Sequence, residues 1–332
     1  MMRETVSTLV LSRLDVAELL GTEECLAAVE AAFRLYAEGR LPAPSVAHVD
    51  GVDGIFHIKA AGLAAPRPLA AVKINGNFPQ NGRRFGLPTI QGLIVLCDGV
   101  TGIPLSVMDS IEITIRRTGA ATAVAAKLLA RPESRIVTIC GCGSQGRIHL
   151  EALKHVFPAL STAYAFDVDE NRAKRFAAEA SGELLIEAIP TSGLAGAVRA
   201  SDICITCTTA QRFFLRRDFV SPGTFVGAVG ADSPEKQELD PLLLKSSTVV
   251  VDILEQAAAM GELHHALREQ IMTTADVHAE LGEVIAGRKP GRTSRDEITV
   301  FDSTGTALQD AAVASVVYEK AIARGTGRFV DF

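Results

Sequence analysis

The chain has 332 residues, of which 48% are hydrophobic and 22% are charged, so it is long enough for about two globular domains. Its net charge of −6 is spread without long runs of like charge, which argues against a nucleic-acid or membrane partner. No apolar run reaches the roughly 20 residues of a membrane span, and Met1-Met2-Arg3-Glu4-Thr5 lacks a signal-peptide core, so a cytoplasmic location is expected.

The first third of the chain is rich in short strand patterns. A strand over 6–11 and helices over 15–20 and 23–39 precede a series of short apolar runs bounded by turn residues. This series is better explained by one mixed sheet than by βαβ repeats. Strands are predicted at 47–49, 54–61, 69–74, 90–97 and 104–109, with a loop over 75–88 and a hairpin turn at Asp98-Gly99.

The pattern changes after Ile115. An alanine-rich helix over 119–129 is predicted to link to a second unit, in which strand and helix patterns alternate to about residue 305. The expected fold is α/β: a Rossmann-type doubly wound parallel sheet, plus a smaller strand-rich α+β domain for substrate binding and dimerisation. A helix over 306–324 is expected to return to the first unit, giving domains of 1–118 plus 306–332 and 119–305. Strands of the second unit are predicted at 136–140, 163–166, 184–188, 202–206, 224–229 and 247–252, and helical segments at 148–156, 172–180 and 193–198.

A glycine motif follows the strand over 136–140. Its spacing is G-x-G-x-x-G, and a helix pattern, a second strand and Asp167 come after it, which together are typical of dinucleotide binding. Asp167 lies 21 residues after the last glycine, where a carboxylate accepts from the ribose 2′-OH and repels a 2′-phosphate, so NAD is favoured over NADP. The alternative is a glycine turn of any α/β fold. The motif residues are Gly141, Cys142, Gly143, Ser144, Gln145 and Gly146.

Other polar residues end strands or lie inside them. Thr206, Cys207 and Thr208 end one strand, and Asp232 follows another, as an acid/base candidate or a helix N-cap before Ser233-Pro234. Lys73 lies inside an apolar strand, where burial without a partner is costly; its alternative is an edge position in solvent.

Three further basic residues are candidates for binding an anion. His57 and Lys59 share one side of their strand and are either ligands or surface residues, and Arg117 suits a carboxylate or an interdomain salt bridge. The six cysteines include Cys204 and Cys207 in a C-x-x-C, but there is no second pair or zinc-spaced histidine, so reduced thiols and no metal are expected.

The sequence resembles the ornithine cyclodeaminase/μ-crystallin family over nearly its whole length, and its second half is most similar to the archaeal-type alanine dehydrogenase branch. The resemblance implies a homodimer, a Rossmann domain that holds NAD(H), and a substrate site between the domains. The matching stretches are Val72–Asn75 with Asn77, Pro79 and Asn81; Thr101–Pro104; Thr114–Ala120; Gly141–Gln145; Val229–Leu239; Leu281–Val284; and Phe301–Gly305.

The same resemblance implies roles for individual residues. Lys73 would contact the substrate carboxylate or carbonyl oxygen, Arg117 would bind the α-carboxylate, and Asp232 would act as acid/base. The substrate-binding set is His57, Lys59, Lys73, Arg117, Thr304 and Gly305. The cofactor-binding set is Thr118, Gly141, Gly143, Ser144, Gln145, Gly146, Asp167, Thr206, Cys207, Thr208, Val229, Gly230 and Thr304.

The chain departs from the cyclodeaminase pattern at several positions. Ser45 stands for an arginine, His57 for a glutamate and Lys59 for a methionine, which weakens the case for ornithine; Gly146 replaces an alanine or serine. The expected activity is an NAD(H)-dependent amino acid dehydrogenase or imine reductase, of alanine or iminosuccinate/aspartate type. The alternatives are a cyclodeaminase lyase that uses NAD catalytically and a crystallin-like binding protein without turnover.

Overall fold

The computed structural model describes residues 7–64 and 67–331, which belong to two compact units. The first unit combines Met1–Arg117 with Thr306–Phe332, and the second is Thr118–Gly305. The residues on which the signal-peptide argument rests, 1–5, and the first residue of the strand predicted over 6–11 lie outside the described residues. In the described part of the chain no helix has the length and hydropathy to cross a membrane.

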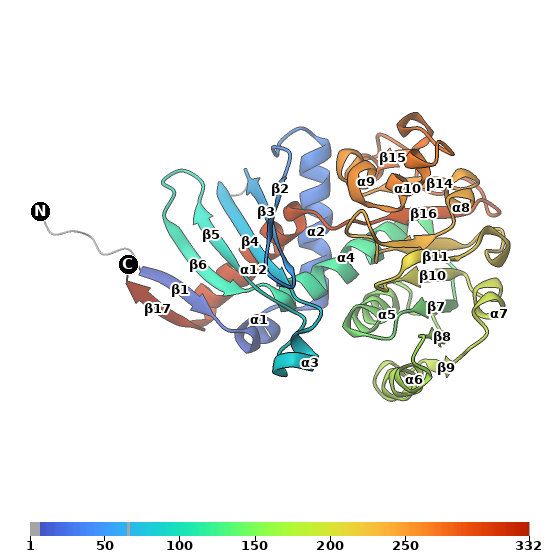
Figure 1. Ribbon diagram of the computed structural model, residues 1–332. Helices are drawn as coiled ribbons and strands as arrows, with labels where there is room; N and C mark the ends of the chain where they lie inside the picture. Colours follow the sequence, from blue (N-terminus) through green and yellow to red (C-terminus); the bar gives the residue numbers. More distant parts are fainter. Residues whose placement is uncertain (1–6, 65–66, 332) are drawn as a thin grey trace, which may run out of the picture. The chain divides into compact units, whose positions relative to one another are not determined.

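The first unit is built on a mixed seven-stranded sheet of order β17-β1-β6-β5-β4-β3-β2, in which only the β1–β6 pair is parallel. Helices α2 (Thr22–Ala37) and α12 (Ala307–Arg324) pack together, and α12 contacts β3 and β4, as Figure 1 shows. The return of the last helix, expected from the sequence, is therefore present. The strands are β1 (Ser7–Leu11), β2 (Ser45–Asp50), β3 (Ile55–Leu63), β4 (Leu69–Asn77), β5 (Ile90–Asp98), β6 (Pro104–Asp109) and β17 (Arg328–Asp331); the short helices are α1 (Arg13–Leu19) and α3 (Asn81–Phe85).

Alternation along these strands gives the sheet two different faces. One face carries fully buried side chains such as Leu9, Ile94 and Met108, which pack beneath the helices. The opposite face keeps Phe56, Ile74 and Leu93 more than a third exposed. The core of this unit therefore lies on the helix side of the sheet.

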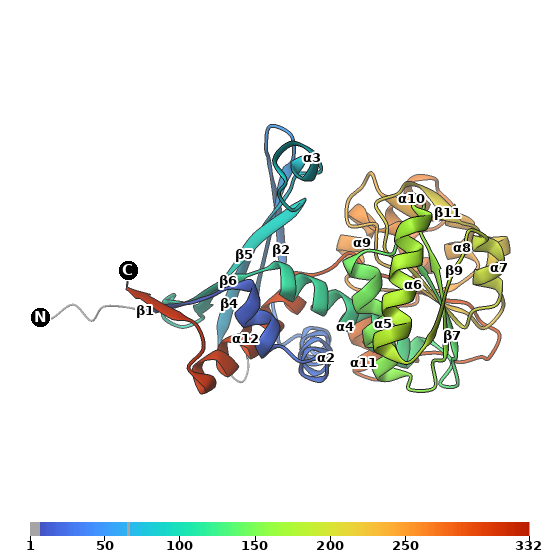
Figure 2. The same ribbon diagram turned by 90° about the horizontal axis from the view of Figure 1, so that it is seen from below.

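The second unit is a doubly wound parallel sheet of order β15-β14-β16-β12-β10-β7-β8-β9, flanked by helices (Figure 2). A further two-stranded sheet joins β11 and β13. The strands are β7 (Ile136–Cys140), β8 (Thr162–Phe166), β9 (Glu187–Pro190), β10 (Ile203–Thr206), β11 (Gln211–Leu215), β12 (Phe225–Ala228), β13 (Gln237–Leu239), β14 (Thr248–Val251), β15 (Ala279–Glu280) and β16 (Thr299–Asp302). The helices are α5 (Ser144–Val156), α6 (Glu170–Leu184), α7 (Leu194–Arg199), α8 (Pro241–Lys245), α9 (Leu254–Met260), α10 (Glu262–Arg268) and α11 (Leu281–Ile285), with short 3₁₀ turns at Arg217–Phe219 and Thr274–Asp276.

Several helices begin, end or occur at residues that differ from those predicted from the sequence. The linking helix α4 runs over Ile111–Leu129 rather than from residue 119, because the Asp109 carboxylate accepts from the Ile111 and Glu112 N–H groups and caps an earlier start. Helix α6 continues to Leu184, so β9 begins at Glu187 rather than 184. The loop predicted over 75–88 contains the end of β4 and helix α3, and helices α8 to α11 were not predicted.

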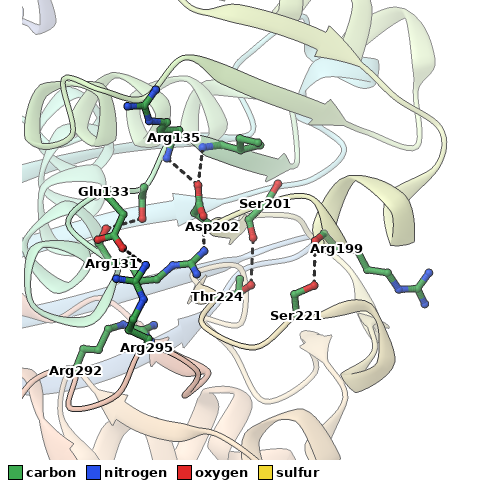
Figure 3. A network of polar contacts seen from close by, with 12 residues as sticks. Arg131, Glu133, Arg135, Arg199, Ser201, Asp202, Ser221, Thr224, Arg292 and Arg295 are labelled. Atoms are coloured by element: carbon green, nitrogen blue, oxygen red, sulfur yellow. Dashed lines mark hydrogen bonds and ion pairs between the residues drawn. The ribbon is translucent and has the colours of Figure 1, made fainter.

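At the amino end of the parallel sheet, a polar network fixes the loops (Figure 3). Asp202, which precedes β10, accepts from the backbone N–H groups of Arg135 (2.8 Å) and Ile136 (3.0 Å) and pairs with Arg131. Arg295 pairs with Glu133 nearby. These contacts hold the starts of neighbouring strands in register, at the end of the sheet opposite to the glycine turn.

Candidate functional site

The turn after β7 has the geometry that its glycines permit. Gly141 has φ +106°, in the region that favours glycine, and a Cβ there would lie 2.8 Å from the Cys207 carbonyl oxygen. A Cβ on Gly146 would lie 2.1 Å from the Gly141 carbonyl oxygen, so helix α5 packs directly on the turn. Gly143 faces open space, with no heavy atom within 4 Å of its Cβ position, and it precedes exposed Ser144 at the start of α5. The N–H groups of this helix start therefore border open space.

Asp167 follows β8 and lies against the same turn. Its Oδ2 accepts from the Cys142 N–H (2.9 Å) and its Oδ1 from the Asp169 N–H (2.9 Å). Arg172 Nη1 lies 3.8 Å from Oδ2. An open pocket of about 400 Å³ adjoins the turn and is lined by residues that include Gly143, Ser144, Arg172 and Arg175. Three arginines (Arg147, Arg172 and Arg175) and the Glu179 carboxylate thus line this space beside the glycine turn, and Asp167 lies against the turn itself.

Three loops at the carboxyl ends of adjacent strands carry the other predicted cofactor residues. These loops follow β10, β12 and β16, and their strands are neighbours in the sheet. Buried carboxylates that the sequence did not single out hold them: Glu238 accepts from the Thr208 and Gly230 N–H groups, and Asp252 accepts from the Thr304 and Gly305 N–H groups. The loop residues are Thr206, Cys207 and Thr208; Val229 and Gly230; and Thr304 and Gly305.

Besides Thr206 Oγ1, two buried polar atoms near this edge have no hydrogen-bond partner among residues 7–64 and 67–331. They are Oε1 of Gln145, in the first turn of α5, and Oγ of Ser303, directly after β16. Buried polar atoms are normally hydrogen-bonded, so these two indicate that a ligand completes the site. Together with the open space at Gly143, they fit a dinucleotide. Thr118, another predicted contact, is buried on α4, and its carbonyl oxygen accepts from Thr122 Oγ1 at 3.3 Å.

Asp232 is an exposed carboxylate in this unit. Its side chain is 55% exposed, and its Oδ1 lies 2.6 Å from Lys236 Nζ. No helix begins directly after Asp232. Residues 233–236 form a turn, in which the Lys236 N–H donates to the Ser233 carbonyl oxygen at 3.1 Å. The N-cap interpretation is therefore wrong, because Pro234 is followed by a return to the strand β13 and not by a helix.

In the first unit, Lys73 and Arg117 converge on one carboxylate. Lys73 Nζ lies 2.6 Å from Asp310 Oδ2, and Arg117 Nε donates to Asp310 Oδ1 at 2.9 Å. Arg117 Nη1 also donates to Gln309 Oε1 at 2.8 Å. All of these side chains are buried. The alternatives of a solvent-exposed Lys73 and of an interdomain pair for Arg117 are wrong, since Lys73 lies in an interior strand and the Asp310 carboxylate belongs to the same unit.

This cluster still has donors for a ligand. Gln309 Nε2 is buried and, in the part of the chain that the structure describes, has no hydrogen-bond partner. The Arg117 contacts use Nε and Nη1, and Nη2 carries two further N–H donors. An unsatisfied amide donor beside two cations suits an anionic group such as a carboxylate.

Burial changes the proton affinity of Lys73. Desolvation lowers its pKa to about 7; the Asp310 charge opposes this change, and the nearby cations Arg117 and Lys59 add to it. For Asp310, desolvation acts upward, but the attraction of Lys73 and Arg117 prevails and the pKa is lowered. Lys73 is therefore poised to exchange a proton at neutral pH.

Lys59 and His57 lie on β3, beside β4. Lys59 is directly opposite Lys73 in the antiparallel register and is buried, so the alternative in which it points to solvent is wrong. His57 pairs with Asn75 and is half-buried, with its ring edge-to-face with His48 at 4.9 Å. Sequence reasoning missed Asp310 and Gln309; their signal was a polar pair near the start of the helix, directly before the apolar run Ala311–Ala314.

Known proteins resemble this chain over nearly its full length. A model of the ornithine cyclodeaminase/mu-crystallin family matches residues 6–325. The alanine dehydrogenase of Archaeoglobus fulgidus is 40% identical over 327 residues, 98% of this chain and 99% of that protein. An archaeal alanine dehydrogenase dimer with bound NAD has a TM-score of 0.94 at 41% identity, covering 98% of this chain and 99% of its own. The Δ1-pyrroline-2-carboxylate reductase of Thermococcus litoralis, in complex with NADH and L-proline, has a TM-score of 0.92 at 35% identity, covering 97% and 100%.

Proposed function

This chain belongs to the ornithine cyclodeaminase/mu-crystallin family, and we propose that it is an NAD(H)-dependent oxidoreductase acting on the C–N bond of a small amino or imino acid. The observation that carries this function is the buried cluster of Lys73, Arg117, Asp310 and Gln309. It offers N–H donors and positive charge to a substrate carboxylate in a place from which bulk water is excluded.

The second unit supplies the cofactor residues. The helix start at Gly143 and Ser144 would hold the pyrophosphate, the Asp167 carboxylate would accept from the ribose hydroxyls, and the loops after β10, β12 and β16 would line the nicotinamide end. NADH, when bound, supplies the hydride that reduces the imine carbon. The residues that would make these contacts are those of the cofactor-binding set, from Thr118 to Thr304.

The residues of the first unit bind and orient the substrate and move protons. Arg117 Nη2 and Gln309 Nε2 would donate to the α-carboxylate and fix its position. Lys73, with its pKa lowered to about 7, would donate a proton to the developing amine during reduction and accept it in the reverse direction. Asp310 holds that proton on Lys73 through the ion pair. Asp232 is a second candidate acid/base.

Two other activities within the family are less well supported. A cyclodeaminase acting on ornithine would bring a second ammonium group toward a site that already contains buried Lys59, Lys73 and Arg117, and like charges repel. A binding protein without turnover has no need for a lysine whose pKa is lowered to about 7 beside a carboxylate-binding arginine.

The burial of Lys59 favours a particular substrate class. Lys59 is opposite Lys73 in the sheet, and its charge contributes to lowering the pKa of both Lys73 and Asp310. A dicarboxylic imine such as iminosuccinate would place its second carboxylate near these cations. A monocarboxylic substrate of the alanine type is the alternative, and it needs only Lys73 and Arg117.

A homodimer is also part of the proposal. The face of the seven-stranded sheet opposite Lys73 exposes apolar side chains: Val10 (38%), Phe56 (37%), Ile74 (43%) and Leu93 (52%), of which Ile74 and Leu93 are cross-strand neighbours. A second copy of the chain would cover these exposed apolar side chains, in keeping with the dimer of the archaeal alanine dehydrogenase. Sedimentation of the purified chain should give a dimer, and a monomer at micromolar concentration would contradict this assignment.

The experiment that tests the activity is an NADH-oxidation screen. Pyruvate, oxaloacetate and other 2-oxo acids are supplied with ammonium or methylamine, and cyclic imino acids are supplied alone. Oxidation that requires both the carbonyl compound and the amine supports the proposal. Absence of NADH oxidation with all of them would refute it.

A further inference from the structure

Three buried carboxylates of the second unit make no contact assigned to substrate chemistry. Glu238, Glu262 and Asp302 have exposures of 0%, 1% and 0%. Each accepts backbone N–H groups of the segment that carries the next carboxylate or a cofactor loop. We call this series the carboxylate ladder, and it runs from Asp302 through Glu262 to Glu238.

The ladder begins at the end of β16. Asp302 Oδ1 accepts from the Glu262 N–H at 3.1 Å, and Oδ2 accepts from the Leu263 N–H at 2.9 Å. The carboxylate lies so close to the helix start that a Cβ on Gly261 would be 2.6 Å from Oδ2. Asp302 therefore fixes the start of α10, and with it the position of the Glu262 side chain.

Glu262 makes the second step. Its Oε1 accepts from the Glu238 N–H at 2.8 Å, and its Oε2 accepts from the Leu239 N–H at 3.1 Å. These two residues belong to the short strand β13, which pairs only with β11 among the described strands. Because a three-residue strand has little hydrogen bonding of its own, Glu262 supplies the acceptors that hold it in place.

Glu238 makes the last step, and it reaches two cofactor loops at once. Its Oε1 accepts from the Thr208 N–H at 2.6 Å, and its Oε2 accepts from the Gly230 N–H at 2.8 Å. A Cβ on Gly230 would lie 2.4 Å from the carboxylate carbon, so this loop approaches as closely as glycine allows. One carboxylate thus ties the loop after β10 to the loop after β12.

We propose that Glu238 is a positioning residue for the dinucleotide: it holds the Thr208 and Gly230 loops at the spacing that the nicotinamide end of the cofactor requires. This inference rests on the proposed function. Glu262 and Asp302 act through Glu238, because they fix the backbone from which it projects.

A carboxylate is needed at this position, and an amide does not replace it. The two N–H donors face two different oxygens, and a glutamine would present its own NH₂ to one of them. Burial raises the pKa of Glu238, and it raises the pKa of Glu262 well above its ordinary value and that of Asp302 to about 7. Burying these three carboxylates costs desolvation free energy. The backbone N–H groups that donate to them offset this free energy only while the loops stay in place.

The test compares Glu238→Gln with a matched control, Asp202→Asn. Asp202 is also a carboxylate that accepts two backbone N–H groups, both on Oδ2, and its Oδ1 pairs with Arg131 (Figure 3). It precedes β10, whereas the cofactor loops follow the carboxyl ends of their strands. NADH binding is measured by fluorescence titration, and stability by the thermal midpoint Tm. Glu238→Gln should raise the Kd for NADH about tenfold, which corresponds to about 1.4 kcal/mol, while kcat at saturating NADH changes less. Asp202→Asn should lower Tm without changing that Kd.

An unchanged Kd in Glu238→Gln would overturn the proposal, and so would an equal rise of Kd in both variants, which would reduce the effect to lost stability. A wild-type chain that does not bind NADH would instead overturn the proposed function. If Glu238→Gln does not fold, Glu262→Gln provides the same readout, because Glu262 precedes Glu238 in the ladder and holds the strand that carries it. It should raise the Kd by a smaller factor, and an unchanged Kd in that folded variant would equally overturn the proposal.

Discussion

Replacement of Asp310 by asparagine tests the proton-donor role of Lys73. The Asp310 carboxylate is 2.6 Å from Lys73 Nζ and is the group that opposes the lowering of the Lys73 pKa. In Asp310→Asn this attraction is lost, while burial and the repulsion by Arg117 and Lys59 remain. The pKa of Lys73, which is about 7 in the native chain, should therefore fall further, by about 1–3 pH units, the range for one close opposite charge.

The sign of the effect on activity follows from the direction of the reaction. Imine reduction needs the protonated Lys73, so kcat/KM should decline as the pH rises through about 7 in the native chain and at lower pH in the variant. The ratio of native to variant kcat/KM, measured from about pH 5 to about pH 9, removes the ionisation of the substrate from the comparison. This ratio should rise with pH across the interval between the two pKa values. The variant should also lose about 3–5 kcal/mol of stability, because two cations lose their buried partner.

Glu24→Gln is the control for this experiment. Glu24 pairs with Lys320 of the same helix α12 at 2.7 Å, but both side chains are partly exposed at the surface. Its pH profile should match that of the native chain. A profile of Asp310→Asn that coincides with the native one, or that moves to higher pH, would refute the role of Lys73.

Four further substitutions have defined outcomes. Asp167→Ala should weaken NADH more than NADPH binding, since the carboxylate that repels a 2′-phosphate is removed and Arg172 remains; a native preference for NADPH in Kd measurements would contradict this. Arg117→Lys should lower kcat/KM by an amount equivalent to about 1–3 kcal/mol of lost transition-state stabilisation. Unchanged kinetics would exclude the carboxylate contact. Asp232→Asn should cut kcat about 10²-fold with NADH binding intact if it is the acid/base, and normal turnover would leave Lys73 alone in that role. Lys59→Met should lower kcat/KM for oxaloacetate plus ammonium relative to pyruvate plus ammonium, and an equal ratio in both proteins would remove the dicarboxylate assignment.

Local sequence patterns predicted much of this fold. The glycine turn was predictable because a buried strand, three glycines at fixed spacing and Asp167 all lie within one continuous stretch. The burial of Lys73 was suggested by its apolar neighbours on β4. By contrast, the start of α4 was missed because Ile113, Thr114 and Ile115 have low helix propensity, and the helix forms there because its side chains pack, with Ile113 fully buried.

The residues that complete the site depend on contacts between distant parts of the chain. Asp310 lies far along the sequence from Lys73 and Arg117, and only the packing of α12 on the first sheet brings the three together. Glu238 similarly serves two loops that come from different strands. A single sequence shows the need of a buried lysine for a partner, but it does not show which of the 39 acidic residues supplies it.

The stoichiometry of NADH consumption distinguishes a reductase, which consumes NADH, from a cyclodeaminase, which regenerates its cofactor in each turnover. The purified chain is incubated with NADH, ammonium and the 2-oxo acid that gives the fastest rate, and both NADH and the amino acid are quantified. We predict that one NADH is consumed for each amino acid formed, and that ornithine with catalytic NAD releases no ammonia. Release of ammonia from ornithine without net change in NADH would refute the proposed reductase activity and identify a cyclodeaminase instead.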